Sequence, residues 1–223
     1  MNIPIGVFVT GTDTGVGKTF VAAALLRALG DAGLRAVGMK PVAAGIDPGC
    51  GVNADVAALA RAGNVDAPLA DRNPYAFGAP VAPHLAAHAE GRTIDIGVIV
   101  QAYGRLAARS DAVVVEGAGG ALVPLDERRD MLDIACALGL PVLLVVGMRL
   151  GCLNHALLSA LAIRARGLVL AGWVANRLSP DLPLADANAD ALARRLGLAP
   201  LATFGVGMPS RFAPEALAAL EMP

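Results

Sequence analysis

Residues Gly11 to Thr19, with the sequence Gly-Thr-Asp-Thr-Gly-Val-Gly-Lys-Thr, carry the most specific chemical pattern in this chain. They fit Gly-x-x-x-x-Gly-Lys-Ser/Thr, in which glycines let successive backbone N–H groups point at one anion. We expect Lys18 to reach the β- and γ-phosphates of a nucleotide and the Thr19 hydroxyl to ligate Mg²⁺. The alternative is a glycine-rich turn that binds nothing. It is disfavoured because the segment fits the whole motif and stands between an apolar run and a helical pattern, where the motif is expected.

Lysine is rare in the chain and falls only where charge chemistry is expected. Of 18 basic residues, only Lys18 and Lys40 are lysines, and the rest are arginines. Lys40 follows a short apolar run and precedes Pro41, so it lies at a strand end. An ammonium group there could neutralise a transferring phosphoryl group or a carboxylate-like acceptor. A solvated lysine at a strand end is the alternative, and the scarcity of lysine argues against it.

Two acidic residues could complete a metal site. Glu116 ends the apolar run Ala112–Glu116 and precedes the glycines of 117–120, so it resembles the strand-end carboxylate that meets Mg²⁺ in P-loop proteins. Asp55 opens a predicted helix and could be a second carboxylate at the metal. It could equally be a first-turn aspartate favoured by the helix dipole, and spacing alone favours that interpretation.

Three later segments are open to more than one interpretation. Val145–His155 combines a strand, a glycine-rich turn and a helix start, where Asn154 either caps the helix or leaves N–H groups free to hold a carboxylate. His155 has no acidic or metal-binding partner in the sequence, so we interpret it as structural. Asn176, at the end of another apolar run, could read an adenine edge through its amide. The stiff, proline-rich stretch Asn73–His84 is predicted to be a packing loop.

Strand-like and helix-like patterns alternate along the chain and position these residues. Continuous apolar runs typical of buried strands cover Ile5–Thr10, Ala36–Met39, Ala112–Glu116, Val142–Val146 and Leu170–Ala175. Helical patterns cover Lys18–Ala32, Ala54–Ala62, Ile96–Ala108, Met131–Leu138, Leu153–Arg166 and Ala185–Leu196. This alternation predicts an α/β fold with a doubly wound, mostly parallel sheet, and ligands in such sheets bind where the strands end.

The composition limits the classes of protein to be considered. The 223 residues are most simply one domain, 1–223, with 56% hydrophobic and 17% charged residues. The net charge of −1 indicates neither a nucleic-acid nor an anionic-membrane partner.

The first residues lack the basic region of a signal peptide, and the most apolar stretch, Ile134–Val146, is too short to span a membrane. Cys50, Cys136 and Cys152 share no CxxC spacing, so we expect reduced thiols and a cytoplasmic location.

Taken together, the motifs resemble the dethiobiotin synthetase family of P-loop NTPases over nearly the whole chain. The resemblance is carried by Gly11–Thr19, Lys40-Pro41-Val42, Asp55, Asn73–His84, Glu116–Gly120, Gly147–Ala156 and Ala171–Asn176. It is weak over the last forty or so residues. The resemblance implies an ATP- and Mg²⁺-dependent closure of a cyclic urea. In that reaction, 7,8-diaminononanoate and CO₂ form a carbamate, ATP phosphorylates it, and the second amine closes the ring with release of phosphate.

The resemblance also implies a role for each matching residue. Lys18 and Lys40 would be catalytic, and Thr19, Asp55 and Glu116 would hold Mg²⁺. The nucleotide would be bound by Gly15, Val16, Gly17, Lys18, Thr19, Phe20, Asp55, Glu116, Gly117, Ala118, Gly119, Asn176 and Arg177. The substrate would be bound by Thr14, Lys40, Ala44, Leu150, Gly151, Cys152 and Asn154. The family forms homodimers with active sites at the interface, so the 150–154 turn of one subunit would hold the carboxylate tail of substrate bound by the other.

The chain departs from the family pattern at two positions, and rival classes remain open. Gly15 stands where the family often has Glu, and Ala44 stands where it often has a hydroxyl, so any contact at residue 44 must come from the backbone. The strongest rival is an ATPase switch of the ParA/MinD kind, which usually carries a lysine near the start of the loop, where this chain has Thr12 and Asp13. An amide-forming ligase of cobalamin synthesis and a pure nucleotide-binding module are less favoured.

Overall fold

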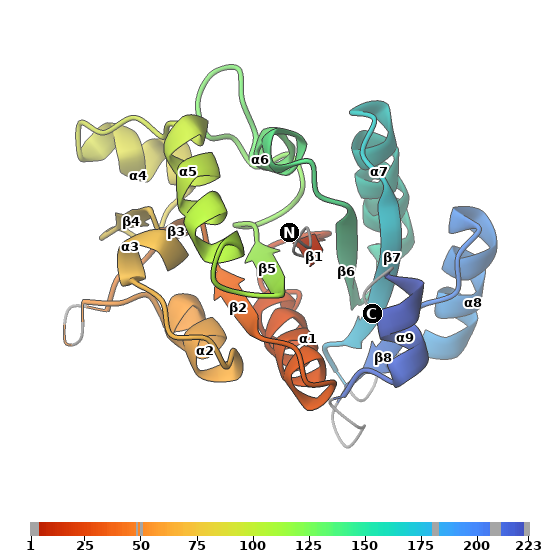
Figure 1. The fold of residues 1–223 in the computed structure, drawn as a ribbon. Coiled ribbons are helices and arrows are strands. Elements are labelled where there is room, and N and C mark those ends of the chain that lie inside the picture. Colours follow the sequence, from red (N-terminus) through yellow and green to blue (C-terminus); the bar gives the residue numbers. More distant parts are fainter. Residues whose placement is uncertain (1–4, 48, 50, 180–182, 206–210, 221–223) are drawn as a thin grey trace.

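Strands and helices alternate along the chain in the computed structural model, which describes all residues except 1–4, 48, 50, 180–182, 206–210 and 221–223 (Figure 1). In chain order the elements are β1 (Ile5–Gly11), α1 (Lys18–Asp31), β2 (Ala36–Met39), β3 (Val42–Ala44), α2 (Ala54–Ala62), α3 (Leu69–Arg72), β4 (Tyr75–Phe77), α4 (Pro83–Ala89), α5 (Ile96–Ala107), β5 (Ala112–Glu116), α6 (Met131–Leu138), β6 (Val142–Met148), α7 (Cys152–Ala165), β7 (Leu170–Arg177), α8 (Ala185–Leu196), β8 (Ala202–Phe204) and α9 (Pro214–Ala219).

The main sheet has six strands in the order β2-β5-β1-β6-β7-β8, and all of its neighbouring strands are parallel. The strand β5 therefore lies between β1 and β2 although it follows both in the sequence. Because parallel strands end at the same edge of a sheet, residues that follow β1, β2 and β5 are brought together there. The predicted doubly wound, mostly parallel α/β fold is confirmed.

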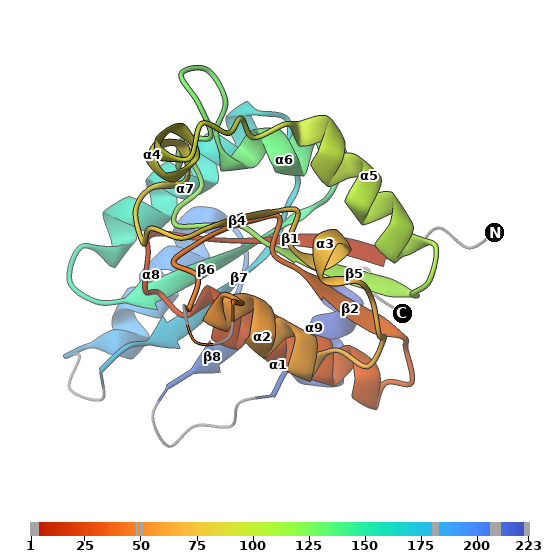
Figure 2. The ribbon, with the colours of Figure 1, turned by 90° about the vertical axis from the view of Figure 1, so that its left-hand side faces the viewer.

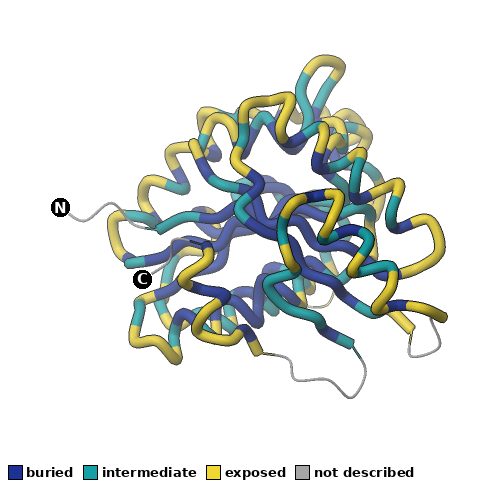
Figure 3. Tube along the Cα trace, turned by 90° about the vertical axis from the view of Figure 1, so that its right-hand side faces the viewer, coloured by how far each residue is buried: buried dark blue, intermediate teal, exposed yellow. Residues whose placement is uncertain are grey.

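Helices cover both faces of this sheet (Figure 2). On one face, α4 to α8 pack against strand residues such as Phe8, Val113 and Trp173. On the other face, α1, α2 and α9 pack against the alternate strand residues, such as Val7 and Val114. Side chains of a strand point alternately to its two faces, so continuous apolar runs are what a doubly covered sheet requires. The central strands are accordingly buried beneath exposed helix surfaces (Figure 3).

Several helices begin or end at residues that satisfy their free backbone groups. Asn53 caps α2 by accepting a hydrogen bond from the N–H of Asp55. Asp130 and Asp133 form a reciprocal capping box at the start of α6, and Gly139 ends that helix with φ of 65°. Asn53 and Asp130 thus fix the starts of α2 and α6, and Gly139 fixes the end of α6.

The stretch Asn73–His84 is not wholly a packing loop, and this part of the prediction is wrong. It contains β4 and the start of α4, and β4 pairs with β3 in a small parallel sheet of its own. Three-residue strands are too short to show a period in the sequence, and their pairing depends on residues more than thirty positions apart. The short elements α3, β8 and α9 escape sequence analysis for the same reason of length.

No helix within the described part of the chain is long and apolar enough to cross a lipid bilayer.

Candidate active site

The glycine-rich loop joins β1 to α1 and encloses the start of that helix. Gly15 and Gly17 have φ of 74° and 90°, in the left-handed region that glycine adopts without steric cost. The buried ammonium of Lys18 donates a hydrogen bond of 2.9 Å to the carbonyl of Asp13. Because the first N–H groups of a helix have no partner within it, the loop and the start of α1 form an anion-binding site.

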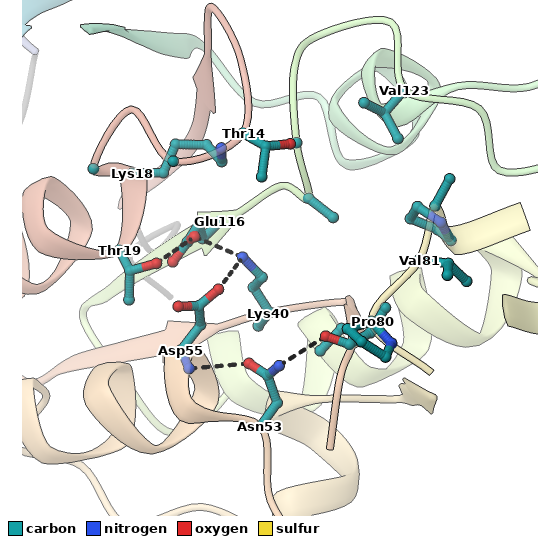
Figure 4. A pocket seen from close by; sticks show the side chains of 18 residues that line it. Thr14, Lys18, Thr19, Lys40, Asn53, Asp55, Pro80, Val81, Glu116 and Val123 are labelled. Atoms are coloured by element: carbon teal, nitrogen blue, oxygen red, sulfur yellow. Dashed lines mark hydrogen bonds and ion pairs between the residues drawn. The ribbon is translucent and has the colours of Figure 1, made fainter. Parts of the chain in front are cut away.

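Beside this loop, four side chains from four separate parts of the chain form a polar cluster (Figure 4). The Lys40 ammonium lies 2.6 Å from Glu116 Oε1 and 3.0 Å from Asp55 Oδ2. It also lies 3.3 Å from the carbonyl oxygen of Gly117. The Thr19 hydroxyl donates to the same Glu116 oxygen at 2.8 Å. The cluster therefore joins the glycine-rich loop to both predicted carboxylates.

The order of the strands explains why these side chains meet. Lys40 directly follows β2, Glu116 is the last residue of β5, and the glycine-rich loop follows β1. In the register of the sheet, Met39 lies beside Val115 and Val9 lies beside Glu116. The three strands are neighbours in the sheet, so two ammonium groups and a carboxylate converge at one edge.

Burial and neighbouring charges set the acid–base properties of the cluster. Burial lowers the pKa of Lys18, and the positive charge of Lys40 lowers it further, to about 8. Burial also disfavours the charged form of Lys40, but the Glu116 and Asp55 carboxylates outweigh it and raise the pKa of Lys40. Burial alone would raise the pKa of Asp55, whereas the Lys40 ammonium and the Thr19 hydroxyl bring it below its usual value.

The oxygen atoms of this cluster fit a magnesium ion. Glu116 is fully buried, and its Oε2 has no hydrogen-bond partner among the described residues, so a buried carboxylate oxygen is left for a ligand. The Thr19 hydroxyl and the half-exposed Asp55 carboxylate lie beside it. Within the described ranges no three His, Cys, Asp or Glu side chains converge on a common point. Mg²⁺ suits such a site because it commonly uses one or two carboxylates, with phosphate and water completing its octahedron.

The cluster opens into a cavity of about 650 Å³. Its polar wall is formed by the glycine-rich loop, Lys40, Asp55 and Glu116. Its opposite wall is apolar and comes from Ala43, Ala44, Pro80–Pro83 and Val123. Of the residues singled out in the sequence, the cavity is lined by Thr14, Gly15, Gly17, Lys18, Thr19, Lys40, Ala44, Asp55, Glu116, Ala118 and Gly119. The cavity thus combines an anion-binding end with a surface suited to an aliphatic chain.

A family model described as an AAA domain matches residues 5–204, which include all of the cluster and the cavity. The chain belongs to this AAA-domain family. It is a P-loop NTPase domain by fold, and the family includes dethiobiotin synthetase.

Solved structures with the same fold come from several kinds of P-loop protein. One is the cell division protein FtsY from Thermotoga maritima, with 18% identity and a TM-score of 0.53 over 99% of this chain and 69% of that chain. MinD in the MinC:MinD cell division complex from Aquifex aeolicus matches at 14% identity and TM-score 0.56, over 97% of this chain and 85% of the other. Signal recognition particle 54 kDa protein from Aeropyrum pernix, in complex with GDP, matches at 16% identity and a TM-score of 0.57, over 98% of this chain and 46% of that chain. At these identities the likeness establishes the fold alone.

Some residues that were predicted to contact the nucleotide contact other residues of the chain instead. The Asn176 amide donates a hydrogen bond of 2.8 Å to the carbonyl of Val16, and so supports the glycine-rich loop from β7. Arg177 forms an ion pair with Asp186 of α8. Phe20 packs edge to face on Phe204, with ring centroids 5.4 Å apart. Of the remaining predicted contacts, Val16 is buried in the loop, and Gly117 touches the cluster through its carbonyl.

The predicted substrate turn at 150–154 does not line the cavity of its own subunit. Leu150 is 97% exposed, Cys152 is buried and Gly151 is the N-cap of α7. Asn154 lies exposed in the first turn, so the interpretation of Asn154 as the helix cap is wrong. Glycine suits the N-cap position because residue 151 has φ of 93°, in the left-handed region. An ion pair between Arg149 and Asp13 links this turn to the glycine-rich loop.

Two asparagines that hold the site in place were not identified in the sequence. Asn53 caps α2 just before Asp55 and donates two hydrogen bonds of 3.0 Å to the carbonyls of Ala44 and Gly45. It therefore ties the apolar wall to the metal-side carboxylate. The preference for Asn before a helix start could have identified it. Asn73 contacts the backbone of Lys40, and no sequence pattern signals a contact across 33 positions.

Proposed function

We propose that the chain is an ATP-dependent dethiobiotin synthetase, which forms the cyclic urea of dethiobiotin from 7,8-diaminononanoate, CO₂ and ATP. The observation that supports this most is that Lys18, Lys40 and the two carboxylates paired with Lys40 lie together at one end of a cavity whose other wall is apolar. A triphosphate would bind at the charged end of the cavity, and the methylene chain of the diamine would pack against its apolar wall. A module that only binds nucleotide needs neither Lys40 nor the apolar wall.

The proposed reaction needs positioning and charge neutralisation, and it needs no strong general base. One amine of the diamine combines with CO₂ to give a carbamate and a proton. A carbamate oxygen then attacks the γ-phosphorus of ATP, which forms a mixed anhydride and releases ADP. The second amine attacks the anhydride carbonyl, the ring closes and phosphate leaves. Each step places negative charge beside ammonium groups, and Lys18 and Lys40 stabilise that charge.

The residues of the cluster divide these tasks. Lys18 and the loop N–H groups hold the phosphates, while Lys40 faces the carbamate and the transferring group. Thr19, Asp55 and Glu116 would hold Mg²⁺, which supplies charge neutralisation to the phosphates. Ala44, where the family often has a hydroxyl, places a methyl group on the cavity wall. The Ala44 carbonyl already accepts a hydrogen bond from Asn53. A Cβ added at Gly15 would meet no other atom within 4 Å, so the absence of a Glu side chain there leaves open space.

We also propose a homodimer that brings the 150–154 turn to the cavity of the partner subunit. Leu150, Leu158 and Leu161 are 97%, 56% and 65% exposed, and the last two lie on one face of α7. Large apolar side chains grouped on one exposed helix are typical of interaction surfaces. The N-terminus of α7, with no side-chain cap, would then be available to the substrate carboxylate.

The proposal is tested by measuring ATP consumption and dethiobiotin formation with diaminononanoate, bicarbonate and Mg²⁺, each omitted in turn. We expect product only when all are present. Hydrolysis that ignores the diamine but responds to DNA or lipid vesicles would instead favour the ParA/MinD-like switch. Thr12 and Asp13, at the positions where those ATPases carry lysine, argue against that outcome.

Replacing either lysine gives a sharper test. Lys18→Gln and Lys40→Gln should each lower kcat for ring closure by about 10²-fold or more, because each removes an ammonium group that stabilises developing charge. Circular dichroism should show the wild-type fold for both variants. Ring closure at the wild-type rate in either variant would refute the role assigned to that lysine.

A further inference from the structure

The peptide groups of Lys40 are held by a segment that does not line the cavity. Lys40 follows β2, which lies at the edge of the six-stranded sheet, so no strand among the described residues lies on the outer side of β2. The Lys40 N–H instead donates to the carbonyl of Arg72 at 2.7 Å. The Lys40 carbonyl accepts a hydrogen bond of 2.7 Å from the Asn73 amide nitrogen. Both backbone groups of Lys40 are therefore tied to residues 72 and 73.

Asn73 itself is fixed from several directions. Its side chain is buried, and the same amide nitrogen donates a second hydrogen bond of 3.0 Å to the carbonyl of Tyr75. The Tyr75 N–H in turn donates to the carbonyl of Pro41 at 3.0 Å. Asn73 thus bridges the end of β2 and the start of β4, and the small sheet of β3 and β4 continues the same connection. The amide acts as a rigid link because it is buried and bonded on both sides.

A flexible lysine needs such a link to place its charge. The Lys40 ammonium must meet Glu116 and Asp55 at 2.6 and 3.0 Å, and a four-carbon stem has many rotamers. Pro41 has no N–H to donate, so after Lys40 the chain is held through the Pro41 carbonyl, which accepts from Tyr75 next to Asn73. We propose that Asn73 is a positioning residue for Lys40, fixing the backbone from which the ammonium reaches the carboxylates. The kinetic part of this inference rests on the proposed function.

The test compares Asn73→Leu, which removes both donated hydrogen bonds at similar volume, with the control Asn64→Leu at a more exposed asparagine. Asn64 also bonds two backbone groups around β2, the N–H of Ala36 and the carbonyl of Leu34, but at the opposite end of the strand. Protein labelled with ¹⁵Nζ- and ¹³Cε-lysine gives only two lysine side-chain signals, assigned with Lys18→Gln and Lys40→Gln. The signals are recorded at one fixed pH without substrate.

We expect Asn73→Leu to shift the Lys40 signal and to increase the exchange of its ammonium protons, while the Lys18 signal stays in place. In the ring-closing assay, kcat should fall about 10- to 100-fold, because a displacement of about 1 Å can cost that much, with the KM for ATP nearly unchanged. Asn64→Leu should leave both lysine signals and kcat near wild type. If Asn73→Leu does not fold, Asn73→Ser, which keeps one hydroxyl donor, should show the same changes in smaller size.

Two results would overturn the inference. One is an unchanged Lys40 signal in a folded Asn73 variant. The other is an equal fall of kcat in Asn64→Leu, which would mean that any weakening of β2 has this effect. If the wild-type protein closes no ring, the proposed function fails, but the lysine signals still decide whether Asn73 positions Lys40.

Discussion

Lys18 and Lys40 share one cavity but differ in acid–base character. Lys18 has only a carbonyl as its hydrogen-bond partner among the described residues, and burial with the charge of Lys40 brings its pKa to about 8. Lys40 is held between the Glu116 and Asp55 carboxylates, which raise its pKa despite burial. At neutral pH both groups are ammonium ions, and Lys18 is the one close to titration. Lys18 is therefore the residue whose charge responds to pH and to a bound triphosphate.

Lys18 should titrate with a midpoint near 8 in the nucleotide-free protein, far below the ordinary lysine value of 10.5. A triphosphate favours the charged form, so ATP should raise this midpoint. By linkage, ATP binding should weaken as pH rises through 8, because part of the free protein must first take up a proton. The ¹³Cε signal of Lys18, followed over pH with and without ATP, measures both midpoints. A free-protein midpoint near 10.5 would contradict the prediction.

Glu116 should matter for stability as well as for Mg²⁺. Glu116→Gln keeps the side-chain shape but removes the buried charge that faces the Lys40 ammonium at 2.6 Å. Breaking a buried ion pair costs about 3 kcal/mol, and urea unfolding measures that loss of unfolding free energy. Asp111→Asn, in the exposed pair with Arg35, serves as the control and should have a much smaller effect. An equal loss of unfolding free energy in the two variants would show that the buried ion pair stabilises the fold no more than the exposed one.

At the scale of elements, the glycine-rich loop depends on support from a distant strand. β7 brings the Asn176 amide against the carbonyl of Val16, next to Gly17. A Cβ at residue 17 would lie 2.1 Å from the Asn176 amide nitrogen, whereas one at residue 15 would meet no other atom within 4 Å. Both glycines have positive φ, so the two positions differ mainly in the space around them.

Gly17→Ala should therefore weaken ATP binding more than Gly15→Ala does. Both substitutions carry backbone strain of about 1 kcal/mol or more. Only Gly17→Ala must also displace Asn176, which moves the loop, so we expect its Kd for ATP to rise at least tenfold more. Isothermal titration calorimetry measures both affinities. Similar affinities for the two variants would show that Asn176 does not support the loop.

The sequence predicts the elements that are long and the residues that follow them. β1, β2 and β5 are visible as apolar runs, and the rule that ligands bind at strand ends brings Lys18, Lys40 and Glu116 to one edge. Physical reasoning could not predict the sheet of β3 and β4, because three residues show no period. It also could not predict that Asn73 bonds to Lys40 or Asn176 to Val16, because each contact depends on how distant segments pack.

At the scale of the whole molecule, the exposed face of α7 is the strongest sign of a partner. Leu158 and Leu161 lie three residues apart on this helix, and both are more than half exposed. Leu150 precedes the helix and is almost fully exposed. These side chains belong to the same turn and helix as the predicted substrate contacts. In the homodimer proposed above, a second copy would cover these side chains.

Leu158→Glu should convert the proposed dimer to a monomer, because a charge at a buried apolar contact is left without a partner. Sedimentation velocity should give a dimer for the wild-type protein and a monomer for the variant. Val169→Glu is the control, since Val169 is 66% exposed but precedes β7 at the opposite end of the sheet. A wild-type protein that sediments as a monomer would contradict the prediction.

The insertion of β5 between β1 and β2 also affects when in folding the nucleotide can bind. Thr19 and Glu116 are 97 positions apart in the chain, and Lys40 and Glu116 are 76 apart. Closing loops of this length is slow, so the polar cluster forms only once the central strands have assembled. ATP therefore meets a finished site and cannot serve as a template for early folding steps. Its effect is to stabilise the folded state by mass action and to slow unfolding.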